Sequence, residues 1–207
     1  MIDSSIIPFR HKGVLMIPAS IYGGIVIKCS QFDGCCARRD DMNTEVVHLE
    51  PMLLGGVGFY GDPFSKRGGW DSDNEIGRAW NRFARYIEEH PVRSYSCGKS
   101  CMYEIHITGS ETDEKGHIEI FVGEEVNTPQ LPFTLSVKFF PGGDYLKVTL
   151  SGREIDSDWW MRLDSEILPS MGLKQDGRFI IQAYDQRFLG MDRLEESTMD
   201  AYIPLKR

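Results

Sequence analysis

Asp200 and Tyr202 place an acidic and an aromatic side chain two positions apart near the C-terminal end of the sequence. The surrounding segment, 199–205, has the pattern of a short strand, and residues two apart on a strand point to the same face of a sheet. A carboxylate beside an aromatic ring could line a cavity for a small organic cation. An ordinary edge strand with a charged outer face has the same pattern, so both interpretations stay open from these residues alone.

Three acids are candidates for general acid chemistry, because burial among aromatic rings raises the pKa of a carboxyl group. They are Glu104, Glu125 and Asp200. The sequence contains no nucleophile elbow, phosphate-binding loop, dinucleotide fingerprint or HExxH motif. Its histidines and the pair Cys97 and Cys101 lack the close spacing of metal ligands. We therefore expect free thiols, no metal, no other cofactor and no assigned catalytic residue.

The composition, with 41% hydrophobic and 26% charged residues among 207, is that of a globular protein. A formal net charge of −8 works against contact with a phosphate backbone, so direct nucleic acid binding is not expected. Five cysteines, an odd number without a regular framework, favour a reducing compartment, and we expect the protein in the cytoplasm. The apolar run 14–27 is short for a membrane span and contains Pro18, so no membrane contact is expected.

The N-terminal residues lack the pattern of the rest of the chain. We expect 1–43 to form a poorly ordered or peripheral extension and 44–207 to form the domain. Met42 directly precedes the first well-patterned strand. Residues 1–41 are therefore interpreted as an upstream extension of the reading frame, a hypothesis that N-terminal sequencing would test.

The chain positions these residues with two similar sets of elements. Ser72 followed by Glu75 fits a capping box, so a helix is expected there, ending before Pro91. Asp156 and Ser157 suggest the cap of a second helix. Apolar faces place Trp80 and Trp160 in the core and turn Trp159 toward a cleft. Strands are predicted on both sides of Glu50-Pro51 and at 102–108, 117–126, 133–140, 145–150, 179–185 and 199–205.

The order strand, helix, strand, strand therefore occurs twice, in halves spanning about 44–127 and 133–207. Each half alone would leave a sheet edge and an apolar face uncovered, and a shared sheet solves both problems. We predict an α+β fold of duplicated βαββ units, with a curved antiparallel sheet, two main helices and a central ligand cleft between the halves.

These features resemble the GyrI-like small-molecule-binding domain, which is also the effector-binding domain of AraC-type and MerR-type multidrug regulators. Six motifs occur in the family's order across residues 44–207. They are Glu50-Pro51-Met52, the NEIGRAWNRF run 74–83, Val122-Gly123-Glu124-Glu125-Val126, the PGGDY turn 141–145, the segment 159–172 and Tyr202-Ile203-Pro204-Leu205-Lys206.

The resemblance implies an aromatic-walled cleft for flat, often cationic, amphipathic molecules. The family places a Glu on the strand after the second helix, where this sequence has Gln182. A carboxylate about 4 Å from a cation contributes up to roughly 4 kcal/mol at an effective dielectric near 20, whereas an amide hydrogen bond contributes about 0.5–1.5 kcal/mol. We therefore hypothesise a preference for neutral or weakly basic aromatic ligands. The predicted ligand-binding residues are Gln182, Asp200, Tyr202, Glu125, Trp159, Tyr103, Phe59, Tyr184 and Tyr145.

The leading functional prediction is a stand-alone binding protein for an amphipathic aromatic molecule, either sequestering it or sensing it for a separate DNA-binding regulator. A second is a topoisomerase-inhibiting interaction protein, with which an acidic chain is compatible. A third, which the resemblance implies because some relatives are hydrolases, is an enzyme that opens strained cyclopropane-type genotoxins with a pocket acid. The absence of Glu at position 182 weakens the third reading.

Overall fold

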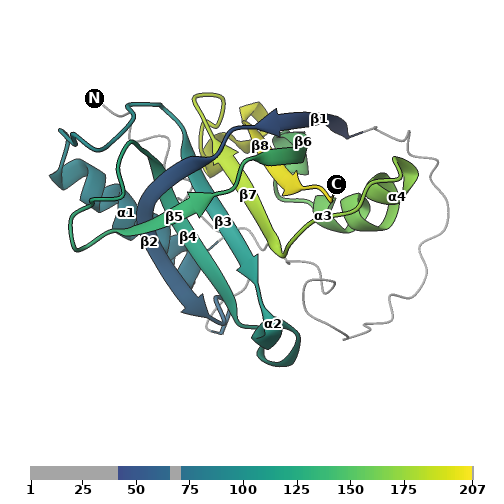
Figure 1. Ribbon diagram of the computed structural model, residues 1–207, viewed down its shortest axis with the longest axis horizontal. Helices are drawn as coiled ribbons and strands as arrows, with labels where there is room; N and C mark the ends of the chain where they lie inside the picture. The colour runs from purple at the N-terminus through teal and green to yellow at the C-terminus, as the bar shows by residue number, and fades with distance from the viewer. Residues whose placement is uncertain (1–41, 66–70, 207) are drawn as a thin grey trace.

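The chain's structure, a computed structural model, describes residues 42–65 and 71–206, so the predicted extension 1–41 lies outside the described residues. It confirms the predicted α+β fold with a curved antiparallel sheet (Figure 1). The sheet has the strand order β1-β6-β8-β7-β3-β4-β2-β5. The strands are β1 (Asn43–Leu49), β2 (Met52–Gly61), β3 (Met102–Thr108), β4 (Ile118–Val126), β5 (Ser136–Phe140), β6 (Gly143–Ser151), β7 (Phe179–Tyr184) and β8 (Thr198–Pro204).

The two halves each contribute a strand to the other half. β3, β4 and β2 lie together, and so do β7, β8 and β6, while β3 pairs with β7 at the seam between them. The first strand of each half crosses over, because β1 pairs with β6 and β5 pairs with β2. This exchange ties the halves at both outer edges of the sheet as well as at the seam.

Two short links force the sheet to curl. β1 and β2 occupy the first and seventh places in the strand order, yet only Glu50 and Pro51 join them. Pro141 and Gly142 join β5 and β6 across the same gap (Figure 1). The links touch, since a Cβ atom at Gly142 would lie 2.7 Å from Pro51 Cδ and 3.0 Å from the Leu49 oxygen. Glycine is required there because the backbones approach so closely.

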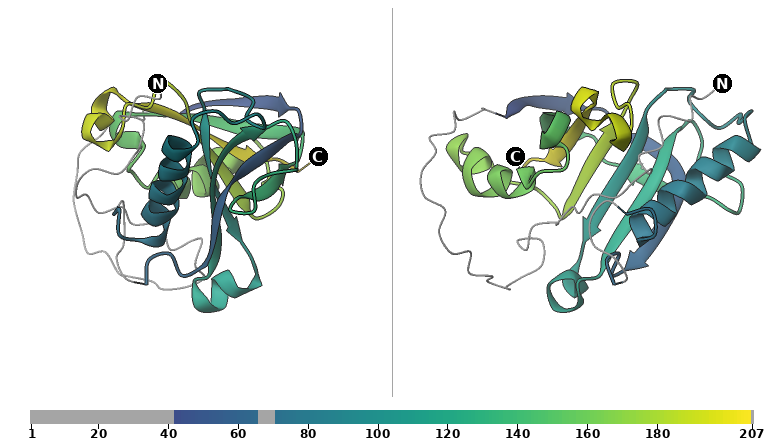
Figure 2. Two further views of the ribbon diagram at one scale, coloured as in Figure 1. Left: turned by 90° about the vertical axis from the view of Figure 1, so that its left-hand side faces the viewer. Right: turned by 180° about the vertical axis from the view of Figure 1, so that it is seen from behind.

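Helix α1 (Glu75–Glu89) covers the first half of the sheet (Figure 2). Its N-cap is Asn74, whose Oδ1 accepts a hydrogen bond from the Gly77 N–H at 2.9 Å, rather than the predicted Ser72. Asparagine caps as well as serine does, and it stands directly before the first helical residue. The helix ends before Pro91, as the sequence predicts.

The second helix is broken into α3 (Trp159–Arg162), a π-helical turn η3 (Leu163–Ile167) and α4 (Leu168–Ser170). Pro169 has no backbone N–H to donate, so the regular series of helical hydrogen bonds is interrupted there. The Leu168 N–H donates to the Leu163 oxygen, five residues earlier, which is the π-helical pattern. Three short elements escaped sequence prediction: α2 (Ser110–Lys115) and the 3-10 helices η2 (Gly152–Glu154) and η4 (Met191–Glu196).

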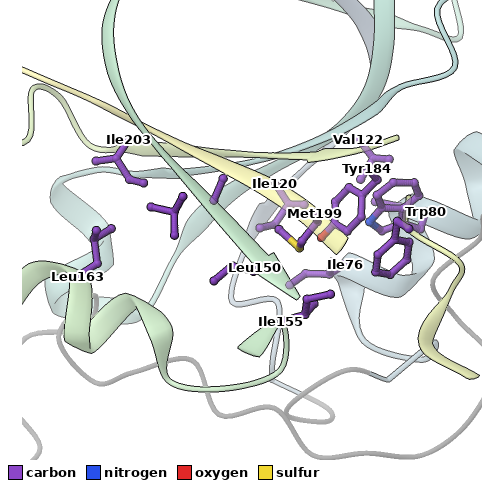
Figure 3. Close-up of a cluster of buried hydrophobic side chains, with 14 of the residues drawn as sticks. Ile76, Trp80, Ile120, Val122, Leu150, Ile155, Leu163, Tyr184, Met199 and Ile203 are labelled. Carbon is purple, nitrogen blue, oxygen red and sulfur yellow. The ribbon is translucent and has the colours of Figure 1, made fainter. Parts of the chain in front are cut away.

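Two apolar clusters lie on opposite faces of the sheet. The larger cluster packs α1 and the α3–α4 region against one face of the sheet, which we call the helix face (Figure 3). Met42, just before β1, also belongs to this cluster. The smaller cluster is on the opposite face, where its buried residues come only from strands. Because no helix contributes to that cluster, the curl of the sheet buries it. Its six buried residues are Leu54, Ile105, Phe121, Phe140, Tyr145 and Ile181.

Candidate functional site

Strand β3, at the seam between the halves, carries alternating apolar and polar residues. Tyr103 and Ile105 belong to the cluster on the opposite face. Successive strand residues point to opposite faces, so Glu104 and His106 lie on the helix face. β3 thus delivers a carboxylate and an imidazole to the middle of the sheet, under the helices.

Glu104 is a buried carboxylate with two hydrogen-bond donors. The Trp80 Nε1–H from α1 donates to Oε2, and His106 Nε2 lies 2.5 Å from Oε1. The Glu104 side chain is 3% exposed and the His106 side chain is 11% exposed. A buried carboxylate is tolerated when hydrogen-bond donors surround it. We refer to Glu104 and His106 together as the Glu104–His106 pair.

Tyr184 forms an aromatic wall beside this pair. Its ring makes edge contacts with Trp80 at 5.2 Å and with Phe188 at 4.9 Å between centroids, and Figure 3 shows it next to Trp80. Burial, with a smaller contribution from the Glu104 charge, raises the pKa of Tyr184 well above its usual value. Its neutral hydroxyl donates to Gln182 Oε1 at 2.6 Å. Gln182 lies opposite Glu104 in the register between β7 and β3.

A cleft of about 240 Å³ opens onto His106 between β3, β7 and the broken second helix. Its apolar surface suits a ring, because Trp160, Phe179 and Ile180 line it. Such a mixture of aromatic, aliphatic and a few charged groups is typical of small-molecule sites. The remaining lining residues are Thr108, Asp113, Asp164, Gln175, Gly177 and Arg178.

The sequence model of one protein family matches residues 45–205, and that family is described as Cass2, integron-associated effector binding protein. The chain belongs to the Cass2 family. Membership confirms the resemblance to GyrI-like effector-binding domains. Among functionally curated proteins, no sequence matches this Cass2 chain.

Solved structures share the fold of this Cass2 protein at low identity. SAV2435 bound to tetraphenylphosphonium has a TM-score of 0.57 and 11% identity, over 80% of this chain and 94% of that one. The Vibrio cholerae integron cassette protein VCH_CASS2 has a TM-score of 0.53 and 14% identity, over 79% and 95%. The EcmrR C-terminal domain has a TM-score of 0.53 and 10% identity, over 81% and 99%.

The nine predicted ligand-binding residues of this Cass2 protein are divided by the sheet. Gln182, Tyr184, Phe59 and Trp159 lie on the helix face, the first two by strand alternation and the others by packing on the larger cluster. None of the nine lines the cleft; Trp160 does so, where the sequence pointed to Trp159. α3 begins at Trp159, and its short first turn leaves Trp160 only partly buried. The other five, Tyr103, Glu125, Tyr145, Asp200 and Tyr202, lie on the opposite face.

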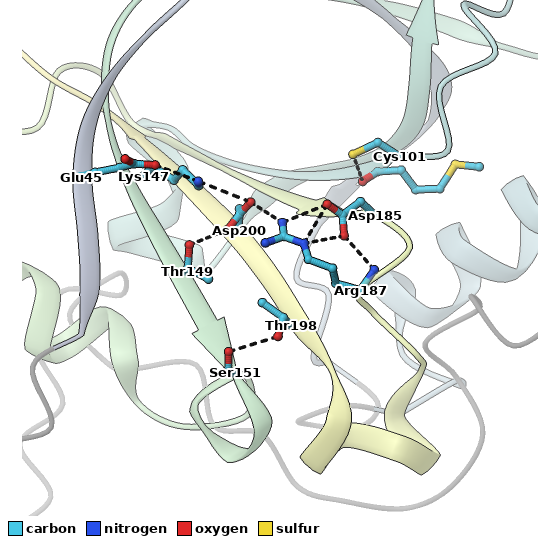
Figure 4. Close-up of polar contacts among 10 residues, drawn as sticks. Glu45, Cys101, Lys147, Thr149, Ser151, Asp185, Arg187, Thr198 and Asp200 are labelled. Atoms are coloured by element: carbon cyan, nitrogen blue, oxygen red, sulfur yellow. Dashed lines mark hydrogen bonds and ion pairs between the residues drawn. The ribbon is translucent and has the colours of Figure 1, made fainter.

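The Asp200 carboxylate contacts side chains of the protein itself (Figure 4). It accepts hydrogen bonds from Thr149 Oγ1 at 2.7 Å and Arg187 Nη2 at 2.5 Å, and Lys147 Nζ lies 4.0 Å away. Arg187 also bonds Asp185, and these bonds together raise the pKa of Arg187. The carboxylate that the sequence placed beside a ligand therefore joins β6 and β8 to the loop after β7.

The remaining predicted residues also have internal partners or packing roles. Glu125 is paired with Lys99 at 2.6 Å. The Tyr145 hydroxyl donates to the Pro141 oxygen at 2.6 Å, and its ring stacks on Phe140. Tyr103 and Tyr202 are partly buried against the smaller cluster.

His106 and Glu104, which the structure brings together beside the cleft, are not among the nine residues predicted from the sequence. The signal was present in the alternation of 103–107, where apolar residues flank an acid and a histidine two positions apart. Within 42–65 and 71–206, no group of His, Cys, Asp or Glu is arranged to hold a metal ion, and no helix is long and apolar enough to cross a membrane.

Proposed function

We propose that this protein is an effector-binding protein that takes an amphipathic, cationic aromatic small molecule into the cleft beside the Glu104–His106 pair. The observation that carries the proposal is the buried carboxylate at the seam, held by Trp80 and adjoining an aromatic-lined cleft. A negative charge in a site of low dielectric attracts a lipophilic cation more strongly than it would in water. A ring stacked on Trp160 would add a cation–π contribution.

The position of the acid changes the expected ligand class. Gln182 alone favours neutral or weakly basic ligands, which is the preference hypothesised from the sequence. Glu104, directly across the seam, supplies the missing negative charge from β3 instead of β7. We therefore revise the preference toward cations, with Gln182 as a neutral neighbour whose Oε1 is held by Tyr184.

A drug-sized ligand would require the cleft to widen, because ligand sites usually measure about 300–1,000 Å³. We expect the broken second helix to be the element that moves. Its π turn and the short α4 lack side-chain caps, and Met161 and Met171 are 43% exposed. Displacement of this region from the sheet would enlarge the cleft while leaving β3 and α1 in place.

The biological role we propose is cytoplasmic sequestration or sensing of a multidrug-like molecule, with a separate DNA-binding regulator as the partner in the sensing case. Support comes from membership in an effector-binding family and from structural likeness to an effector domain. Cys97 and Cys101 are both free, which suits a reducing compartment.

A thermal-shift and fluorescence titration with tetraphenylphosphonium tests the proposal, since a ligand that binds only the folded state stabilises it by mass action. Trp160→Ala is the test variant and Trp159→Ala is its matched control on the same helix. We expect the first to weaken binding about tenfold and the second to weaken it much less. Equal effects would contradict the assigned cleft. Mass spectrometry after incubation with a cyclopropane-bearing alkylator separates binding from hydrolysis.

A further inference from the structure

His106 stands between the buried Glu104 carboxylate and the cleft. Its Nε2 lies 2.5 Å from Glu104 Oε1, while the same side chain lines the cleft. Glu104 itself is not among the residues that line the cleft, so a ligand there meets the carboxylate through the imidazole. The charge that the ligand experiences is therefore the sum of the two groups.

That sum depends on one proton. With a neutral imidazole donating through Nε2, the pair carries a charge of −1. With a protonated imidazole, the pair is a neutral ion pair whose positive member faces the cleft. The first form attracts a cation, and the second form offers it no net charge and places a like charge in its path.

The other charged groups that line the cleft are two carboxylates and one guanidinium group. Asp113 on α2, Asp164 on η3 and Arg178 before β7 line the same cleft. Carboxylates and guanidinium groups ordinarily titrate far from neutrality, whereas imidazole titrates close to it. On the neighbouring elements, Trp80 and Gln182 have no charge to gain, and Tyr184 stays neutral because burial raises its pKa.

We propose that binding of a lipophilic cation in this cleft is coupled to release of one proton from His106, so that the protein is a proton-gated cation site. This inference rests on the proposed function and deepens it. Coupling between two ligands of one site is reciprocal: a proton lowers the affinity for the cation, and the cation lowers the affinity for the proton. Cation affinity should rise with pH by at most about tenfold per pH unit and level off once the imidazole is neutral.

Isothermal titration calorimetry of the full chain with tetraphenylphosphonium tests the coupling. This probe is a permanent cation without a titratable proton, so any pH dependence comes from the protein. Titrations between about pH 5.5 and 8.5 span the range in which imidazole changes charge. Repeating them in two buffers of different ionisation enthalpy counts the protons released. We expect up to one proton released at the acidic end and close to none at the alkaline end.

Three controls make the test specific. Triphenylphosphine oxide, a neutral probe of similar shape, should bind with little pH dependence. His106→Gln keeps a side chain that can donate to Glu104 but cannot become an imidazolium, and it should remove the pH dependence of cation binding. His117→Gln changes a histidine 3.5 Å from Glu111, outside the cleft, and should leave the pH dependence intact.

The outcomes separate this inference from the function on which it rests. If both probes bind and the affinity for the cation is flat across the range, proton gating is wrong and the binding function stands. A pH slope that survives in His106→Gln would also overturn the gating. If neither probe binds at any pH, both proposals fail. A cooperative thermal unfolding transition close to that of the wild type verifies that His106→Gln is folded.

Discussion

Glu104 on β3 lies directly opposite Gln182 on β7 in the antiparallel register that joins the two halves of the sheet. An acid at either position would therefore lie at the seam, under the same helices. Exchange of the two side chains moves a negative charge by one strand and leaves the total composition of the site unchanged.

The first prediction concerns this exchange. Glu104→Gln should weaken tetraphenylphosphonium binding about 10- to 100-fold, because a charge about 6 Å away is worth roughly 3 kcal/mol at an effective dielectric near 20. The double variant Glu104→Gln/Gln182→Glu should recover part of the loss. Fluorescence titration measures both, with triphenylphosphine oxide as the neutral control. Equal losses for the cation and the neutral probe would show that Glu104 acts through packing alone.

The second prediction concerns the donor on α1. Trp80→Phe keeps an aromatic ring against Tyr184 but removes the N–H that donates to Glu104. A buried carboxylate that loses a donor costs about 1–3 kcal/mol. Urea denaturation should show that loss, and a double-mutant cycle with Glu104→Gln should give a coupling energy above about 0.5 kcal/mol. Strict additivity of the two changes would contradict an energetic role for this hydrogen bond.

Much of the fold could be predicted because its signals are local. Period-two alternation located the strands, and the apolar face containing Trp80 together with Pro91 located α1. The sequence could not reveal that β1 and β5 exchange halves, because strand pairing depends on contacts distant in the chain. The same limit applies to the candidate site. The residue types of Asp200 and Tyr202 suggest a ligand site, but which face of the sheet they occupy depends on long-range packing that the sequence does not reveal.

The third prediction tests the contact between the two links. Gly142→Ala would place a Cβ atom 2.7 Å from Pro51 Cδ, and overpacking of this kind costs about 1–3 kcal/mol. Gly109→Ala is the matched control, because a Cβ there would meet nothing within 4 Å. Thermal unfolding should show a lower midpoint for the first variant and a much smaller change for the second. Similar midpoints for both variants would mean that the links can move apart freely.

The fourth prediction concerns acid stability. Burial alone would raise the pKa of Asp185, but hydrogen bonds from the Arg187 guanidinium and backbone outweigh it and lower that pKa. A lowered pKa in the folded state gives stability that is present above the unfolded value, near pH 4, and is lost as the pH falls through the folded value.

Arg187→Gln should therefore be less stable than the wild type at neutral pH, and its stability should fall less between neutral pH and about pH 2. We expect the lost Asp185 contact to contribute about 1–2 kcal/mol at most, because the Arg187 side chain is 40% exposed and solvent screens this pair. The lost hydrogen bond to Asp200 adds to that difference. Urea denaturation at several pH values measures it. A variant whose stability keeps the full acid dependence of the wild type would exclude this pair as its source.

The last prediction concerns alkaline stability and the opposite face of the sheet. Burial, assisted by the charge of Asp200, raises the pKa of Tyr202 to about 12 from a usual value of 10.0. Burial, assisted by Asp176, raises the pKa of Tyr145 to about 12. Because the folded pKa is raised, the stabilisation is complete below pH 10 and is lost as the pH rises toward 12.

Tyr202→Phe isolates one of these phenols, because it retains the ring and removes the ionisable hydroxyl. Absorbance titration of the variant should show one fewer late-ionising tyrosine than the wild type. Its stability should also fall less steeply between about pH 10 and 12, since the unfolded wild-type chain can release this proton while the folded chain retains it. An unchanged slope would mean that Tyr202 ionises as readily in the folded protein as in the unfolded chain, and that this part of the opposite face is open to water.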